Sequence, residues 1–226
     1  MKRGWYGVIC ANGGNEPTLW NHPAYNRKLA NLVYLDLSVD QFSGTIPQQI
    51  GSLTKLDTLH IFDNHLNGST PGELGNVKNL TVLKLHDNQL TVTIPTSFGN
   101  LRNLDTLFLH ANKLSSSIPK KLAYLDNLVA LAMGVNQFSG HLPEQLCQGG
   151  KLEIFMVMSN KLTGPIPRAF GIYQKLRFID LSDDDFHGEL KRRQAGKCES
   201  LVIPVLEITL VVIYHRRLET SKGLRT

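Results

Sequence analysis

The sequence predicts a solenoid of the α/β class, in which coils of equal length stack side by side into a right-handed superhelix. Three observations predict it: an apolar pattern that repeats every 24 residues, a column of asparagines in step with that pattern, and an apolar–proline pair that recurs half a coil later. We expect a parallel β-sheet on the concave face, with short second strands and 3-10 or helical turns on the convex side.

The apolar pattern marks one strand in each of seven coils. Its first position is occupied by Leu32, Leu56, Leu80, Leu104, Leu128, Leu152 and Leu176, and three further positions follow at fixed spacing. All 28 of these positions are apolar, which at 42% apolar composition has a chance probability on the order of 1 in 10^10. A coil of this size has too little apolar surface to fold alone, so neighbouring coils must share one continuous core.

A polar column runs beside the apolar one. It consists of Asn64, Asn88, Asn112, Asn136 and Asn160, with Asp40 and Asp184 at the two ends. An amide carries both donors and an acceptor, so we expect each side chain to turn inward and satisfy backbone groups where the chain leaves the strand. Because the end coils lack a neighbour on one side, an aspartate is tolerable there.

Half a coil later comes an apolar residue followed by proline, as in Ile94-Pro95, usually with a glycine two or three residues before the proline. Proline has no N–H group, so we expect it where the backbone turns out of a short second strand. The apolar residue three positions after each proline, such as Phe98, is expected to anchor the outer face.

The distribution of charge excludes nucleic acid as a partner of the repeats. The net charge of +5 arises entirely within residues 191–226, because residues 1–190 contain sixteen basic and sixteen acidic residues. The cysteines, Cys10, Cys147 and Cys198, form no disulfide framework and lack metal-ligand spacing. No apolar run follows the basic residues at the start, so no secretory signal is expected.

The tail is expected to cap the last coil or to be poorly ordered. Its run 201–214 is apolar apart from Glu207 and Thr209, but it is shorter than the roughly 20 residues of a membrane-spanning helix.

Residues 80–101 show the coil most plainly, with the pattern LxxLxLxxNxL followed by Ile-Pro and Phe-Gly-Asn-Leu. This coil closely resembles the plant-type leucine-rich repeat of receptor-like kinase and receptor-like protein ectodomains, and the resemblance covers residues 29–190. Residues 5–10 resemble the end of that family's N-terminal cap, with Arg3 near the place of its first cysteine. We therefore expect a partial cap over residues 1–31, seven repeats over 32–190 and a non-repeat tail over 191–226.

Side chains between the strand leucines should point to the concave face, because successive side chains alternate. The predicted ligand-binding residues are His60, Phe62, Lys84, His86, Phe108 and His110, extended by Met156 and Met158. Exposed aromatic and imidazole groups on a strand face suit an extended peptide or protein partner. The three histidines would also make binding sensitive to mild acidity.

Catalytic and metal-binding alternatives are disfavoured by spacing. His86 and His110 should be cross-strand neighbours, but a third ligand would have to come diagonally from His60, so no metal or other cofactor is expected. Asp36 and Asp180 should lie six strands apart, roughly 29 Å, which is too far for acid–base catalysis. Two sequons, at Asn67 and Asn79, fall outside the inner strands, so glycans there would leave the concave face free.

The resemblance implies a ligand-recognition module of a cell-surface receptor in signalling or defence, on the extracellular side of the plasma membrane. Its partner would be a peptide, a protein or another leucine-rich-repeat ectodomain, and contact with the membrane would be made only through flanking regions. The chain contains no kinase motif, so it is not expected to be an enzyme. Two alternatives stay open: a secreted inhibitor of microbial wall-degrading enzymes, similar to polygalacturonase inhibitors, and a non-functional gene fragment.

Overall fold

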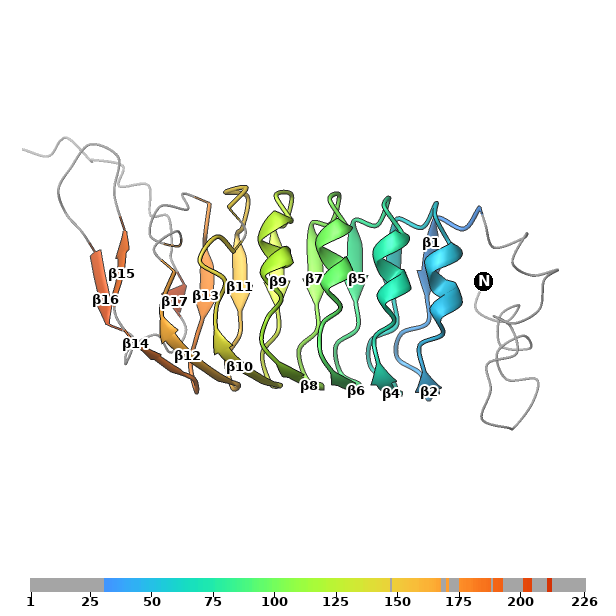
Figure 1. The fold of residues 1–226 in the computed structure, drawn as a ribbon, viewed down its shortest axis with the longest axis horizontal. Coiled ribbons are helices and arrows are strands. Elements are labelled where there is room, and N and C mark those ends of the chain that lie inside the picture. Colours follow the sequence, from blue (N-terminus) through green and yellow to red (C-terminus); the bar gives the residue numbers. More distant parts are fainter. Residues whose placement is uncertain are drawn as a thin grey trace, which may run out of the picture.

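A computed structural model gives the fold of the 226-residue chain. The structure describes residues 31–146, 148–167, 170 and 175–187, and the backbone of residues 189–192, 201–204 and 211–212. The predicted N-terminal cap falls almost wholly outside the described residues, as do the three cysteines Cys10, Cys147 and Cys198. Figure 1 shows the predicted solenoid, a row of similar coils with their strands side by side.

The inner strands form one sheet that runs the length of the solenoid. Its parallel members are β1 (Tyr34–Asp36), β3 (Thr58–His60), β5 (Val82–Lys84), β7 (Thr106–Phe108), β9 (Ala130–Ala132), β11 (Ile154–Met156) and β13 (Phe178–Asp180). Each residue aligns with the one that follows it by a full repeat, so that Leu59 lies beside Leu83 and Leu83 beside Leu107. The sequence period is therefore the register of this sheet, which forms the concave face.

A second parallel sheet and a set of 3-10 turns complete each coil. The strands are β2 (Ser43–Thr45), β4 (His65–Ser69), β6 (Gln89–Val92), β8 (Lys113–Ser116), β10 (Gln137–His141), β12 (Lys161–Pro165) and β14 (Asp185–His187). The 3-10 helices are η1 (Gln48–Ser52), η2 (Gly72–Asn76), η3 (Thr96–Asn100) and η4 (Lys120–Tyr124), each preceded by a proline. Proline fits there because the first N–H groups of a helix have no partner within it.

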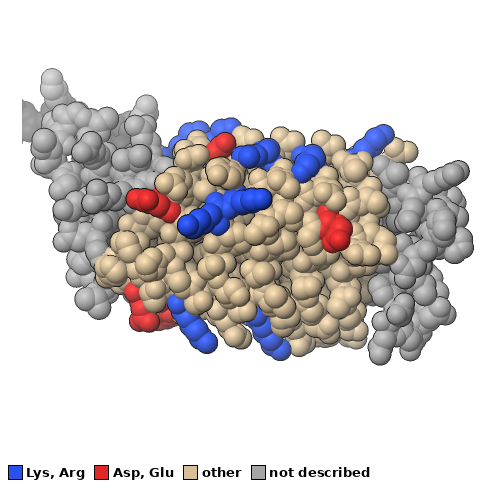
Figure 2. Space-filling model, in the orientation of Figure 1, with Lys and Arg blue, Asp and Glu red and all other residues tan. Residues whose placement is uncertain are grey.

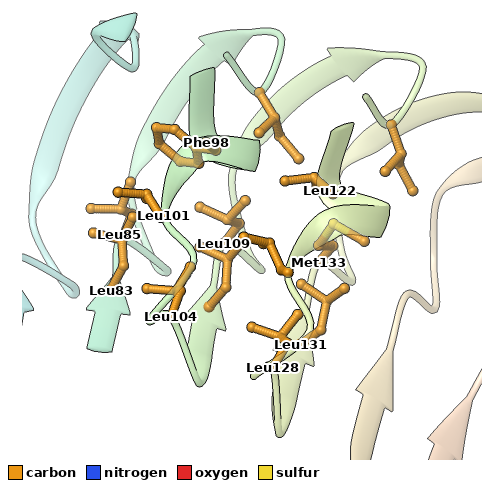
Figure 3. Packing of buried hydrophobic residues seen from close by; sticks show 14 of the residues in the cluster. Leu83, Leu85, Phe98, Leu101, Leu104, Leu109, Leu122, Leu128, Leu131 and Met133 are labelled. Carbon is orange, nitrogen blue, oxygen red and sulfur yellow. The ribbon is translucent and has the colours of Figure 1, made fainter. Parts of the chain in front are cut away.

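The core is a single continuous column of buried apolar side chains between these layers, as predicted, and we call it the spine. Leu83, Leu107 and Leu131 are completely buried. In Figure 3, Leu83 and Leu131 lie among residues of the return segments, such as Leu104, and residues of the 3-10 turns, Phe98 from η3 and Leu122 from η4. The apolar residue three positions after each proline is thus an anchor that holds the convex side to the sheet.

The asparagine side chains turn inward and bond to the backbone, as predicted, and together they form a ladder along the solenoid. The Asn112 side chain donates to the carbonyl oxygens of Leu85, Leu109 and His110 at 3.1–3.2 Å. Its Oδ1 atom accepts from the backbone N–H of Leu90 at 2.9 Å. One amide therefore satisfies backbone groups in two successive coils, which would otherwise be desolvated without partners.

The residue before each ladder position has a left-handed conformation. Its φ lies between 52° and 57° in all seven coils, at Val39, Asp63, Asp87, Ala111, Val135, Ser159 and Asp183. None of these is a glycine, although Asp tolerates this conformation better than Val or Ala does. The turn aims the side chain at this position back toward the concave face, which places Asp87 in the site described below.

A second left-handed position lies near the end of each second strand, where glycine is frequent. Gly68 has a φ of 71° and Gly140 a φ of 79°, but Val92 and Ser116 occupy the equivalent position with φ of 69° and 71°. The backbone of the coil thus imposes this turn even where the sequence lacks the glycine, at a cost of about 1 kcal/mol per residue.

The tail contributes backbone pairing at the C-terminal edge. β17 (Val211–Val212) pairs antiparallel with β13, while β15 (Glu189–Arg192) and β16 (Leu201–Pro204) pair with each other. For this short segment the first of the two expectations for the tail, capping of the last coil, holds, and the pairing covers an otherwise open sheet edge. Among the described residues, no helix is both long enough and apolar enough to cross a membrane.

Candidate functional site

Six rings form a continuous row across the N-terminal half of the concave face. We call this set the aromatic row; it consists of Tyr34, His60, Phe62, His86, Phe108 and His110. At its centre, Phe62 stacks on His86 with ring centroids 4.5 Å apart and an interplanar angle of 17°, and His86 stacks on His110 at 4.3 Å and 9°. The remaining neighbours meet edge-on or tilted at 5.7–5.9 Å.

The row exists because the coils stack in register. Each inner strand and the turn that follows it present two outward side chains, and the parallel alignment sets those of one coil beside those of the next. The Lys84 ammonium lies 5.5 Å from the centroid of the Phe108 ring, a cation–π contact across two strands. The structure thus brings together six of the eight predicted binding residues.

Three carboxylate contacts accompany the rings. Asp36 Oδ2 lies 3.7 Å from His60 Nδ1, and Asp87 Oδ2 lies 2.9 Å from His86 Nδ1 and 4.0 Å from His110 Nε2. Burial, aided by the nearby Lys84, lowers the pKa of His60 below its ordinary value, and burial together with His86 lowers the pKa of His110. Both shifts favour the neutral form of these two imidazoles.

The other predicted residues, Met156 and Met158, lie further along the same face. Both are half-buried, and they cover two small residues of the preceding coil, Ala132 and Gly134. A Cβ atom at Gly134 would approach Met158 Sδ to 2.4 Å, so the thioether occupies the space that a side chain there would need. The C-terminal half of the concave face therefore offers flexible, apolar methionine side chains, whereas the N-terminal half offers stacked rings.

At the two end coils the concave face carries an aspartate and a serine that are hydrogen-bonded to each other. Asp36 Oδ1 accepts from the backbone N–H and the hydroxyl of Ser38 at 3.0 and 2.5 Å. Asp180 Oδ1 accepts from the same two groups of Ser182 at 3.1 and 2.6 Å. Asp36 on β1 and Asp180 on β13 are six strand-to-strand steps apart in the sheet, as expected, which is too far for acid–base catalysis.

Two members of the site escaped the sequence analysis. Asp87 is not among the predicted binding residues, but its carboxylate lies against His86, at a position where the backbone is left-handed with a φ of 52°. The signal that could have found it is an acidic residue directly after a histidine at the position that precedes the ladder asparagine. Tyr34 precedes the inward-pointing Leu35, and its ring extends the aromatic row to the first coil.

The two sequon asparagines have different surroundings. Asn67 is exposed on β4, whereas Asn79 uses its amide to donate to the carbonyl oxygen of Thr54 at 2.9 Å. Asn103 and Asn127 make the equivalent bond to the carbonyl one coil earlier, outside any sequon. Asn79 therefore has a structural role as well, and a glycan there would compete with it.

Charged residues are spread over the side of the solenoid that carries the 3-10 turns (Figure 2). In Figure 2, which views the side that carries the 3-10 turns, basic and acidic residues are scattered without a dense patch of either sign. An apolar recess lined by Leu37, Phe42 and Ile46, among others, opens at the N-terminal end of the spine. It is the open end of the core and is not part of the aromatic row, whose histidines and phenylalanines are half-buried.

A family model described as leucine rich repeat matches residues 78–138. A search of curated proteins finds no match. Among solved structures, the ectodomain of the Arabidopsis receptor kinase HAESA in complex with an N-terminally extended IDA peptide hormone is 34% identical with a TM-score of 0.70, and the match covers 73% of this chain and 28% of that one.

Two further structures place the chain among plant receptors. The plant peptide hormone receptor RGFR1 in complex with RGF2 is 33% identical with a TM-score of 0.68, over 70% of this chain and 25% of the receptor. The ectodomain of the receptor kinase SOBIR1 from Arabidopsis thaliana is 36% identical with a TM-score of 0.51, over 57% of this chain and 68% of that ectodomain. The chain spans about a quarter of the length of the two hormone receptors and two thirds of the shorter ectodomain. It belongs to the plant family of leucine-rich-repeat receptor ectodomains.

Proposed function

We propose that this chain is a ligand-recognition module that binds an extended peptide across its concave face, as part of a cell-surface signalling or defence receptor. The observation that carries the proposal is the aromatic row, a continuous set of rings on a strand face where solvent-exposed polar residues are usual. Its relatives RGFR1 and HAESA were solved in complex with peptide hormones, which supports a peptide ligand.

The size of the surface sets the length of the ligand. From β1 to β11 there are five strand-to-strand steps, which at about 4.8 Å each give roughly 24 Å. An extended peptide advances about 3.3 Å per residue, so about seven residues would contact the face. They would run across the strands, from the aromatic row toward Met156 and Met158.

The chemistry of the face sets the kind of peptide. Asp36 and Asp87 lie beside the imidazoles of His60 and His86, and Lys84 is already engaged above Phe108. A basic side chain of the ligand would gain both an acidic neighbour and a ring face, while its apolar side chains would pack on Phe62 and the methionines. The proposed ligand is therefore apolar with at least one arginine or lysine.

The finer elements of the proposal follow from the family. The module would act on the extracellular side of the plasma membrane, carry a glycan at Asn67 or Asn79, and engage a second leucine-rich-repeat ectodomain as a co-receptor. Its role would be binding rather than catalysis.

A displayed library of random 12-residue peptides, panned against the purified 226-residue protein, tests the proposal. Recovered peptides are then titrated against Phe62→Ala and Phe108→Ala by calorimetry. Each substitution removes ring contact worth about 1.5–3 kcal/mol, so affinity should fall at least tenfold.

Tyr124→Ala is the matched control, because Tyr124 is an exposed ring on η4, on the convex side. It should leave affinity unchanged. Peptides that bind equally to the two phenylalanine variants, or that are lost with Tyr124→Ala, would place recognition elsewhere and overturn the proposal.

A further inference from the structure

We propose that His86, Asp87 and His110 form a binding site for a divalent transition-metal ion, with Zn²⁺ as the best-matched species. The site stands on the geometry of these three side chains alone and does not depend on peptide binding. It also departs from the sequence-based expectation, which sought a third ligand in His60 and found none suitable.

The three side chains converge on one point. One ring nitrogen of His86, one of His110 and an oxygen of Asp87 all lie within 4.8 Å of one another. The same Asp87 oxygen is 2.9 Å from His86 Nδ1 and 4.0 Å from His110 Nε2. Ligand atoms around a tetrahedral zinc ion are about 3.3 Å apart, so only small movements separate this arrangement from coordination.

Those movements are available to the side chains. The His86 and His110 rings lie nearly parallel, at 9°, so at least one must tilt for both nitrogen lone pairs to meet a single ion. Rotation about the last torsion of histidine is soft. Asp87 is exposed, and its side-chain relative accessibility of 52% gives an ion direct entry from solvent.

A simple hydrogen-bonded pair does not explain the whole cluster. His86 and Asp87 alone would satisfy each other, yet the second imidazole is stacked above the first with its own nitrogen aimed at the same carboxylate. Two imidazoles and one carboxylate match the ligand preference of Zn²⁺, Cu²⁺ and Ni²⁺. Ca²⁺ and Mg²⁺ need six or more oxygen ligands, which these residues do not supply.

The surroundings predict moderate affinity. His110 Nδ1 is buried and has no hydrogen-bond partner among the described residues, so nothing orients that ring from behind. Metal-bound histidines normally donate their second N–H to a partner, and losing such a partner costs 10–100-fold in affinity. We therefore expect the affinity to be at least about 10–100-fold weaker than that of structural zinc sites. Three protein ligands leave one position open for water or another donor.

Calorimetric titration of the full chain with ZnCl2 tests the site. The wild-type protein should bind one ion at the concave face. His110→Ala and Asp87→Ala should each weaken that binding at least tenfold, whereas His60→Ala should change it less than twofold. His65→Ala and His141→Ala, in exposed strands of the second sheet, serve as controls that should have no effect.

Two measurements separate loss of a ligand from loss of the fold. Thermal unfolding with EDTA present should be similar for all variants, because the three side chains lie on the surface of the sheet. The cysteines are present in every variant, so thiolate-bound zinc contributes a constant background. Absence of binding at 100 µM zinc would overturn the proposal, as would affinity that ignores Asp87→Ala and His110→Ala or falls with His60→Ala instead.

Discussion

The end coils and the interior coils use the same strand positions in opposite ways. At the first and last coils the concave face carries an aspartate and, two residues on, a serine, and the pair satisfies itself through two hydrogen bonds. In the second to fourth coils the same positions carry rings and Lys84, which pack on one another: Phe62 stacks on His86, and Lys84 lies over Phe108. In the end coils one carboxylate oxygen is therefore satisfied within the coil itself, whereas the interior positions carry the aromatic row.

The asparagine ladder also differs between the interior coils and the last coil. Asn112 donates to three carbonyl oxygens, while at the last coil Asp184 has only oxygens to offer. Its Oδ1 atom accepts from the backbone N–H of Leu162 at 2.7 Å, but Oδ2 is buried with no partner among the described residues. Burial, with the charges of Asp183 and Asp185 nearby, raises the pKa of Asp184 to about 7.

Each interior ladder amide bonds to carbonyl groups of its own coil and of the coil before it, as Asn112 does. The last coil also has a coil before it, so Asp184 occupies a position that suits a hydrogen-bond donor. The difference teaches that an acid is tolerated at this position only with a raised pKa, whereas an amide satisfies it without one.

The largest expected effect is on the free energy of unfolding, when a charge is placed in the core of an interior coil and, for comparison, in that of the first coil. Leu107→Asp should destabilise the fold by more than about 4 kcal/mol, because it places a charge between two neighbouring coils at a fully buried position. Leu35→Asp, in the first inner strand of the described sheet, should cost about half as much, since relaxation toward solvent is possible there. Urea unfolding followed by circular dichroism measures both. Equal losses would show that the spine does not distinguish interior from end.

The next prediction places the end-coil acid in the interior ladder. Asn112→Asp should cost about 3 kcal/mol at pH 8, because a carboxylate would replace the amide that donates to three carbonyls. Asn103→Asp is the control: Asn103 is exposed and makes a single bond to the Lys78 carbonyl, so the cost should stay below about 1 kcal/mol. Free energies of unfolding in urea give the comparison, and similar costs at the two sites would refute it.

The reverse exchange, Asp184→Asn, should stabilise the protein in a pH-dependent manner. The folded pKa of Asp184, about 7, is above its ordinary value of 3.8, so its contribution to stability is fully present below pH 3.8 and is lost as the pH rises through 7. Asparagine does not titrate. The variant should therefore match the wild type near pH 4 and exceed it by about 1–2 kcal/mol at pH 8, after allowance for the solvent that screens a half-exposed carboxylate.

Urea unfolding of both proteins at pH 4.5, 6 and 8 checks this, since all other groups titrate alike and cancel in the difference. Asp185→Asn, which removes only a nearby charge, should give a smaller gain. A difference that is constant with pH would mean that Asp184 is ionised throughout the range.

The fold was predictable because the repeat encodes it directly. Residues separated by one period, such as Leu59, Leu83 and Leu107, become sheet neighbours, so the register, the spine and the ladder follow from counting. The concave columns follow from strand alternation, which is why six of the eight predicted binding residues meet in the structure.

What the sequence did not predict depends on backbone turns and side-chain torsions. Asp87 reaches His86 only because its backbone is left-handed, and the parallel stack of His86 on His110 results from rotamers that no spacing specifies. The raised pKa of Asp184 depends on how deeply its side chain is buried in the last coil. The depth of burial cannot be predicted from a pattern of residue types.

The smallest expected effect on stability comes from moving the end-coil pair into the middle of the concave face. The double substitution Phe108→Asp and His110→Ser gives the fourth coil the Asp-Leu-Ser sequence of residues 36–38. The new carboxylate should accept from the serine N–H and hydroxyl as Asp36 does, which offsets the lost ring contacts of about 0.5–1.5 kcal/mol each. The free energy of unfolding should thus stay within about 1 kcal/mol of the wild type, while affinity for zinc and for recovered peptides falls at least tenfold. If the rings serve recognition, the coil should fold without them, as the two end coils do. A loss of stability above about 2 kcal/mol would instead show that the aromatic row is needed to stabilise the fold.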